Sequence, residues 1–75
     1  MSKYKFKEQA DGTIFIEDEN DDIVAKYKLD KRWREVNYSF KENSINIRLF
    51  NSISRKYKDA TIELDREDLQ IIDYP

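Results

Sequence analysis

Two short segments combine cations with an aromatic ring, which are the residue types that contact phosphates, nucleic-acid bases or acidic protein surfaces. Lysine and arginine pair with phosphate or carboxylate groups, while a flat ring stacks on a base or anchors in a pocket. We therefore take both segments as the candidate partner-binding site: Lys31, Arg32, Trp33, Arg34, Arg55, Lys56, Tyr57 and Lys58. For Trp33 a place in the core remains an alternative, because a ring at a strand end can also fold over an open edge.

Side chains for catalysis are scarce in this chain. It contains no His and no Cys, and neither a nucleophile motif nor a glycine-rich phosphate loop occurs. Acidic residues are abundant, but turns and exposed strand faces do not bury them enough to perturb their pKa values. We expect a protein that is not an enzyme and that needs no cofactor.

One acidic segment, 18–22, partly resembles a calcium-binding loop. Asp18, Asn20 and Asp22 repeat the spacing with which such loops begin. Ile23, however, stands where the loop requires Gly, and Leu29 stands where it requires a bidentate Glu. A polar turn explains the segment, and no metal site is expected.

Strands must position these segments, because apolar and polar residues alternate along most of the chain. The turn at Ala10-Asp11-Gly12 fits a three-residue hairpin loop with Gly12 at positive φ. This loop sets Phe6 opposite Ile16 on the inner face. On the outer face it predicts two ion pairs across the strands: Lys5 with Glu17, and Lys3 with Glu19.

Loops of four residues at 19–22, 30–33 and 41–44 continue this alternation into further hairpins. The predicted pairs are Ile16 with Ala25, Ile14 with Tyr27, Tyr27 with Val36, Ala25 with Tyr38, Lys28 with Glu35, Phe40 with Ile45, Tyr38 with Ile47 and Val36 with Leu49. A one-residue slip would turn every side chain to the other face, so agreement across all four hairpins favours a meander.

The pattern weakens after Phe50. We interpret 51–60 as an irregular connection and 61–64 as a sixth strand. Asp65 is a plausible N-cap, and Leu69 with Ile72 has helical spacing, which predicts a short C-terminal helix. The expected fold is one domain over residues 1–75, mainly β: a small antiparallel five- to six-stranded meander or half-open barrel with that helix.

The expected topology also sorts the charges. The chain has a net charge of −2, but a meander sends alternate turns to opposite ends. The two basic segments should therefore share one end with the Asp11-Gly12 turn, and the acidic 17–22 turn should lie at the other. Lys26 and Lys28 are expected on the solvent side of the sheet. Phe15 and Phe50 fall on the outer face and form a candidate secondary interface.

These features favour non-catalytic binding to a macromolecule, most of all a protein, by a small regulator or inhibitor. Residues with AT-rich codons dominate the composition, which is typical of a low-GC bacterium or its phage. The alternative is a single-stranded nucleic-acid-binding protein, against which stand the acidic net charge and the lack of a known nucleic-acid-binding motif. Open strand edges make a homodimer a further option. No apolar run approaches 18 residues, so we expect no membrane contact and a cytoplasmic location.

Overall fold

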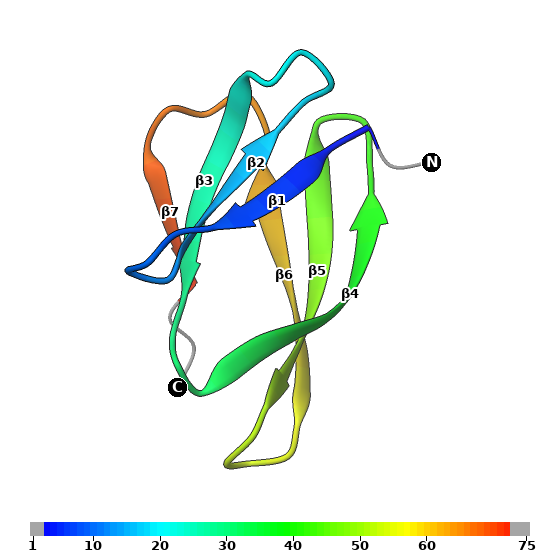
Figure 1. The fold of residues 1–75 in the computed structure, drawn as a ribbon. Helices are drawn as coiled ribbons and strands as arrows, with labels where there is room; N and C mark the ends of the chain where they lie inside the picture. The colour runs from blue at the N-terminus through cyan, green and yellow to red at the C-terminus, as the bar shows by residue number, and fades with distance from the viewer. Residues whose placement is uncertain (1–2, 73–75) are drawn as a thin grey trace.

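The computed structural model describes residues 3–72, which form seven strands and, within that range, no helix (Figure 1). The mainly β prediction is therefore confirmed, while the number of strands differs. The strands are β1 (Lys5–Glu8), β2 (Thr13–Glu17), β3 (Ile23–Leu29), β4 (Trp33–Phe40), β5 (Ser44–Asn51), β6 (Tyr57–Glu63) and β7 (Leu69–Ile72). In this part of the chain no helix is long and apolar enough to cross a membrane.

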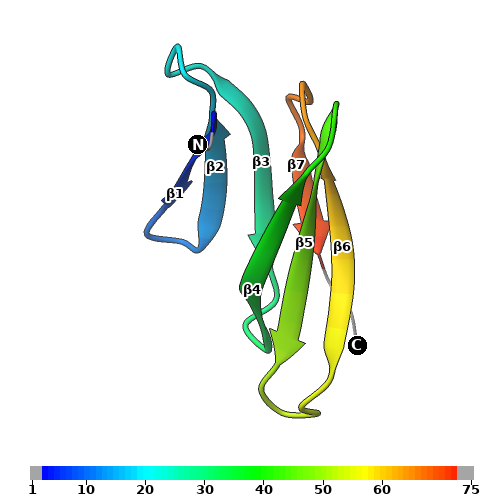
Figure 2. The ribbon, with the colours of Figure 1, turned by 90° about the vertical axis from the view of Figure 1, so that its right-hand side faces the viewer.

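The strands form two sheets that face each other across a shared core (Figure 2). One sheet has the order β1-β2-β3-β7, and the other has the order β4-β5-β6. Neighbouring strands are antiparallel except β3 and β7, which are parallel. Large side chains from both sheets fill the space between them, among them Tyr27 and Ile16 from one sheet and Ile45, Ile47 and Leu49 from the other.

The first hairpin has the predicted register, and the second has it as far as Ile16, after which a bulge sets Glu17 opposite Ile23. Phe6 lies opposite Ile16, and Ile16 in turn lies opposite Ala25. Lys5 is the cross-strand neighbour of Glu17, and Ile14 is that of Tyr27. Gly12 has a φ of 91°, as its turn requires. Local turn chemistry therefore determines the pairing in this part of the molecule.

The predicted hairpin between β3 and β4 is wrong. These strands belong to different sheets, so Tyr27 does not pair with Val36, nor Ala25 with Tyr38, nor Lys28 with Glu35. The chain turns at Asp30, whose carbonyl accepts a hydrogen bond from the Trp33 amide (3.0 Å). Trp33 then enters the core, which directs β4 across to the opposite layer.

The hairpin of β4 and β5 follows the prediction over its first half. Phe40 lies opposite Ile45, and Tyr38 lies opposite Ile47. Farther along, a bulge between Glu35 and Asn37 shifts the register, so Leu49 faces Glu35 and not Val36 as predicted. Because a bulge bends the strand that carries it, β4 changes direction midway (Figure 1).

The predicted C-terminal helix is not formed. Residues Leu69–Ile72 are β7, which pairs in parallel with β3. Two features of the turn before β7 differ from a helix start: the Asp65 amide donates to the Val24 carbonyl (2.7 Å), and Asp65 has a positive φ of 60°. Gln70 and Ile72 are buried and alternate with exposed Leu69 and Ile71, which is the period of a strand. The predicted helix was to end before Pro75, and residues 73–75 lie outside the described residues.

Candidate binding surface

The two predicted basic segments lie at the same end of the molecule. The turn before β4 and the turn between β5 and β6 are joined by a hydrogen bond from the Ser52 amide to the Arg32 carbonyl (3.1 Å). Both turns form the lower end in Figure 1. We call the six cations that these segments carry the basic end: Lys31, Arg32, Arg34, Arg55, Lys56 and Lys58. The predicted grouping of these residues is confirmed.

Most cations of the basic end are exposed. Arg32 is half-buried, and its guanidinium is held by Asp30 (2.9 Å between Nε and Oδ1). Within residues 3–72, no carboxylate forms an ion pair with Lys31, Arg34, Arg55 or Lys56. Exposed like charges held close together create a local positive potential although the whole chain is acidic.

Trp33 is not part of this surface. Its side chain is only 6% exposed and belongs to the core cluster, so the expectation of an exposed tryptophan is wrong and the alternative place in the core is correct. Trp33 begins β4 and lies opposite Asn51, on the side of the sheet that faces the other layer. The ring can therefore neither stack on a base nor enter a partner's pocket.

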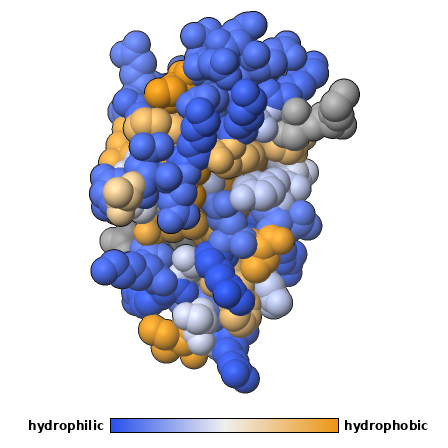
Figure 3. Space-filling view, viewed as in Figure 1, coloured by the Kyte–Doolittle hydropathy of each residue, from blue (hydrophilic) through white to orange (hydrophobic). Residues whose placement is uncertain are grey.

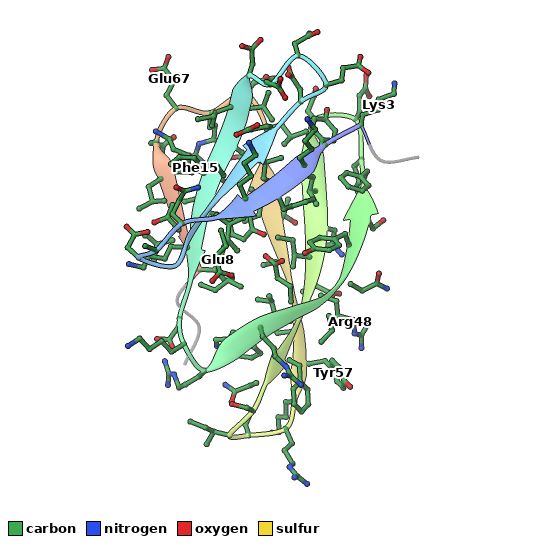
Figure 4. All side chains as sticks on the ribbon, in the orientation of Figure 1. Lys3, Glu8, Phe15, Arg48, Tyr57 and Glu67 are labelled. Atoms are coloured by element: carbon green, nitrogen blue, oxygen red, sulfur yellow. The ribbon has the colours of Figure 1, made fainter. Side chains whose placement is uncertain are left out.

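Tyr57 supplies the exposed ring instead, and it is accompanied by Arg48, which was not among the predicted site residues. Tyr57 is 57% exposed, and the Arg48 guanidinium lies over its ring, 4.9 Å from the centroid. Phe50 packs beside it with ring centroids 5.0 Å apart. Figure 4 shows Arg48 and Tyr57 next to each other on the β5–β6 hairpin. This cluster extends the basic end along the outer face of the three-stranded sheet.

Phe15 and Phe50 do not form one secondary interface. Phe50 lies on the outer face of the β4-β5-β6 sheet, where it contacts Tyr57. Phe15 lies on the outer face of the other sheet, between Lys7 and Lys26 of the neighbouring strands. The two faces point away from each other because the sheets pack through their inner sides.

Acidic turns occupy the opposite end of the molecule. The 18–22 turn lies there beside the 41–43 and 64–68 turns, which are joined by a hydrogen bond from the Leu64 amide to the Asn43 carbonyl (3.0 Å). Asp21 pairs with Lys5 (3.0 Å), and that ion pair lowers the pKa of the Asp21 carboxyl. Lys5 and Glu17 are cross-strand neighbours as predicted, but Lys5 forms its ion pair with Asp21, and Glu17 forms one with Lys7 (3.3 Å). The predicted bipolar distribution of charge is present.

A cleft of about 360 Å³ opens between the first hairpin and β4. Its lining includes Glu8, Trp33, Glu35 and Tyr38. Both oxygens of Glu35 accept hydrogen bonds from phenols, one from buried Tyr27 and one from Tyr38 (2.5 Å). Burial, reinforced by these bonds, raises the pKa of both tyrosines well above the ordinary value. Both phenols therefore act as donors at neutral pH: the bond from Tyr27 connects the two sheets, and the bond from Tyr38 lies within β4.

The described residues offer no cluster suited to a metal ion. Within residues 3–72, no three or more Asp or Glu side chains are grouped closely enough to hold one. In the 18–22 turn, the Asp18 carboxylate accepts hydrogen bonds from the Asn20 and Asp22 amides (2.9 and 3.0 Å). The polar-turn interpretation of that segment explains its geometry.

Comparisons with known proteins do not assign the chain to a family: no family model matches it, and no curated protein or solved structure is significantly similar. The surface must be interpreted from its own chemistry. Sequence reasoning missed Arg48 because it lies on a regular strand outside the basic segments. It also missed Ile53, an exposed residue of the turn between β5 and β6, because the interval 51–60 shows no clear alternation.

Proposed function

We propose that this protein is a non-catalytic binding module whose basic end docks on an acidic surface of a protein partner. The hydrogen bond between Ser52 and Arg32 is the observation that carries the proposal, because it joins two turns from different parts of the chain. The fold gains nothing from collecting exposed cations there, since like charges repel one another slightly. An acidic partner would relieve that repulsion and would be steered to this end by the field.

A protein partner is favoured over nucleic acid by the places of the aromatic rings. Trp33 is buried, and one face of Tyr57 is covered by Arg48. Stacking on single strands uses rings whose faces are open to successive bases. The second candidate, a single-stranded nucleic-acid-binding protein, is supported by the same cluster of Phe50, Tyr57 and Arg48 beside the exposed cations.

Two matched charge reversals test the proposal. In the first variant, Arg55→Glu and Lys56→Glu are combined at the basic end. In the control, Lys3→Glu and Lys41→Glu are combined at exposed positions elsewhere. Both variants change the net charge equally. Each protein is immobilised and incubated with a lysate of the cells that encode it, with and without nuclease, and the captured molecules are identified by mass spectrometry.

We expect the unmodified protein and the control to capture the same protein after nuclease treatment, and the basic-end variant to lose it. Recovery of nucleic acid alone would favour the second candidate. Equal capture by both variants would show that the basic end is not the contact surface. The proposal includes a regulatory or inhibitory role, and it places the protein in the cytoplasm. Cell fractionation of the captured complex tests this location.

A further inference from the structure

An isoleucine projects from the outermost turn of the basic end. Ile53 is 75% exposed, more than any other large apolar side chain within residues 3–72. It lies in the turn between β5 and β6, between Ser52 and Ser54. Figure 3 shows a small apolar area at this end of the molecule among hydrophilic side chains. This isoleucine lies outside the core cluster and outside the residues packed against it.

Hydrogen bonds hold this turn in one conformation. The buried Asn51 side chain accepts from the amides of Ile53 (2.8 Å) and Ser54 (3.0 Å) through Oδ1. The Asn51 backbone bonds both Lys56 (2.9 Å) and Arg55 (2.8 Å), and Arg55 has a positive φ of 62°. The bond between Ser52 and Arg32 ties the turn to its neighbour. Ile53 is therefore held away from the body of the protein at low entropic cost for binding.

We propose that Ile53 is an anchor that enters an apolar recess with an acidic rim on a protein partner. This inference rests on the proposed function and specifies its contact. The apolar side chain at the tip fits a recess, while Arg55 and Lys56 of the same turn and Lys31 of the neighbouring turn fit carboxylates around it. A preorganised apolar residue at the centre with charges at its edge is the usual arrangement of an interface anchor.

The flanking serines favour a protein recess over a lipid bilayer. Ile53 is flanked by Ser52 and Ser54, whose side chains carry hydroxyls. Burying these groups in hydrocarbon leaves them without hydrogen-bond partners, which is costly. A protein recess can supply such partners. Insertion of Ile53 between the bases of a nucleic acid is an alternative that the experiment below distinguishes from binding to a protein recess.

Photocrosslinking tests the anchor directly. A diazirine-bearing analogue of isoleucine is placed at position 53 in one sample and at position 23 in the control. Ile23 is 50% exposed and begins β3, at the end of the molecule opposite the basic end. We expect position 53 to form an adduct with a protein, at a peptide rich in Asp or Glu, and position 23 to form none.

The protein so identified is then purified, and its affinity is measured by calorimetry. Ile53→Ser should weaken binding by about 10- to 100-fold, the effect of burying one large aliphatic side chain. Ile23→Ser should leave the affinity within about twofold. Because both side chains are exposed, thermal melts of the two variants should match that of the unmodified chain.

Three results would overturn the anchor. One is unchanged affinity in Ile53→Ser. The second is an adduct with lipid or nucleic acid alone, accompanied by Ile53-dependent binding to phosphatidylserine vesicles or to single-stranded oligothymidine. The third is capture that depends on Arg55 and Lys56 while position 53 crosslinks to nothing. That third result leaves the proposed function intact, whereas capture insensitive to the charge reversal removes the proposed function itself.

Discussion

Glu35 connects the two layers of the protein through its side chain. Its carboxylate accepts from Tyr27, which belongs to β3, and from Tyr38, which belongs to its own strand β4. The sequence placed Glu35 in an exposed pair with Lys28. The structure turns it inward instead, because β4 lies in the opposite sheet. Glu35 is therefore a link between the two layers and not, as predicted, a surface charge paired with Lys28.

The raised pKa values of Tyr27 and Tyr38 predict that the folded protein loses stability at alkaline pH. In the folded protein the pKa values of Tyr27 and Tyr38 are raised, mainly by burial. The unfolded chain therefore releases these protons first, near pH 10. Their contribution to stability is complete below about pH 10 and falls as the pH rises further. Urea unfolding at pH 8 and pH 11 measures this change.

Tyr27→Phe is the matching control. It should reduce the free energy of unfolding at pH 8 by about 1–3 kcal/mol, because Glu35 loses a donor. It should also lose less stability between pH 8 and pH 11 than the unmodified protein. An equal loss in both proteins would show that Tyr27 does not titrate as its burial implies.

Gly12 has a positive φ because of the turn in which it lies. Its φ of 91° is costly for side chains with a Cβ, although no atom lies closer than 4.0 Å to the position that a Cβ would take. Strain rather than a clash should therefore limit substitution. We expect Gly12→Val to lower stability by about 1–2 kcal/mol and Gly12→Asn to lower it less. Equal thermal melts for the two variants would contradict this assignment.

At the scale of elements, β7 closes the side of the molecule where the two sheets come together. The Gln70 side chain accepts from the Glu63 amide (3.0 Å) and donates to the Glu63 carbonyl (2.8 Å). A side-chain amide thereby takes the place of a neighbouring strand at the end of β6. This is a tertiary role that no local pattern around Gln70 indicates.

Gln70→Leu tests this closure. The substitution keeps approximate volume but removes both hydrogen bonds, so we expect a loss of about 1–3 kcal/mol in the free energy of unfolding. Leu69→Gln is the control, because Leu69 is adjacent, 42% exposed and on the other face of β7. That change should be neutral within about 0.5 kcal/mol. Chemical denaturation that gives equal losses for both would refute the role of Gln70.

At the scale of the whole molecule, one core serves both sheets, and Trp33 belongs to it. We expect Trp33→Ala to cost about 3–5 kcal/mol, which approaches the total stability of a small domain. The variant should be largely unfolded at room temperature by circular dichroism, whereas Trp33→Phe should keep the fold with a lower melting temperature. An unchanged melting temperature in Trp33→Ala would show that the ring is not structural.

The sequence by itself determined the hairpins whose registers depend on local turns. Gly12 and the alternation around it were sufficient for β1, β2 and β3, and the same holds for the first half of the β4–β5 pair. It also predicted that the two basic segments meet. That prediction holds because β3 and β5 both run toward the basic end, although they belong to different sheets.

Only the tertiary structure decided which strand edges pair and which apolar residues remain outside. Alternation shows the face of a strand on which a side chain lies, but it does not show which strand will take the open edge of β3. That edge is taken by β7 from the far end of the chain, while β4 lies in the second layer and Trp33 in the core. Ile53 stays exposed for the same kind of reason: the burial of each residue depends on the packing of distant segments, which local sequence does not specify.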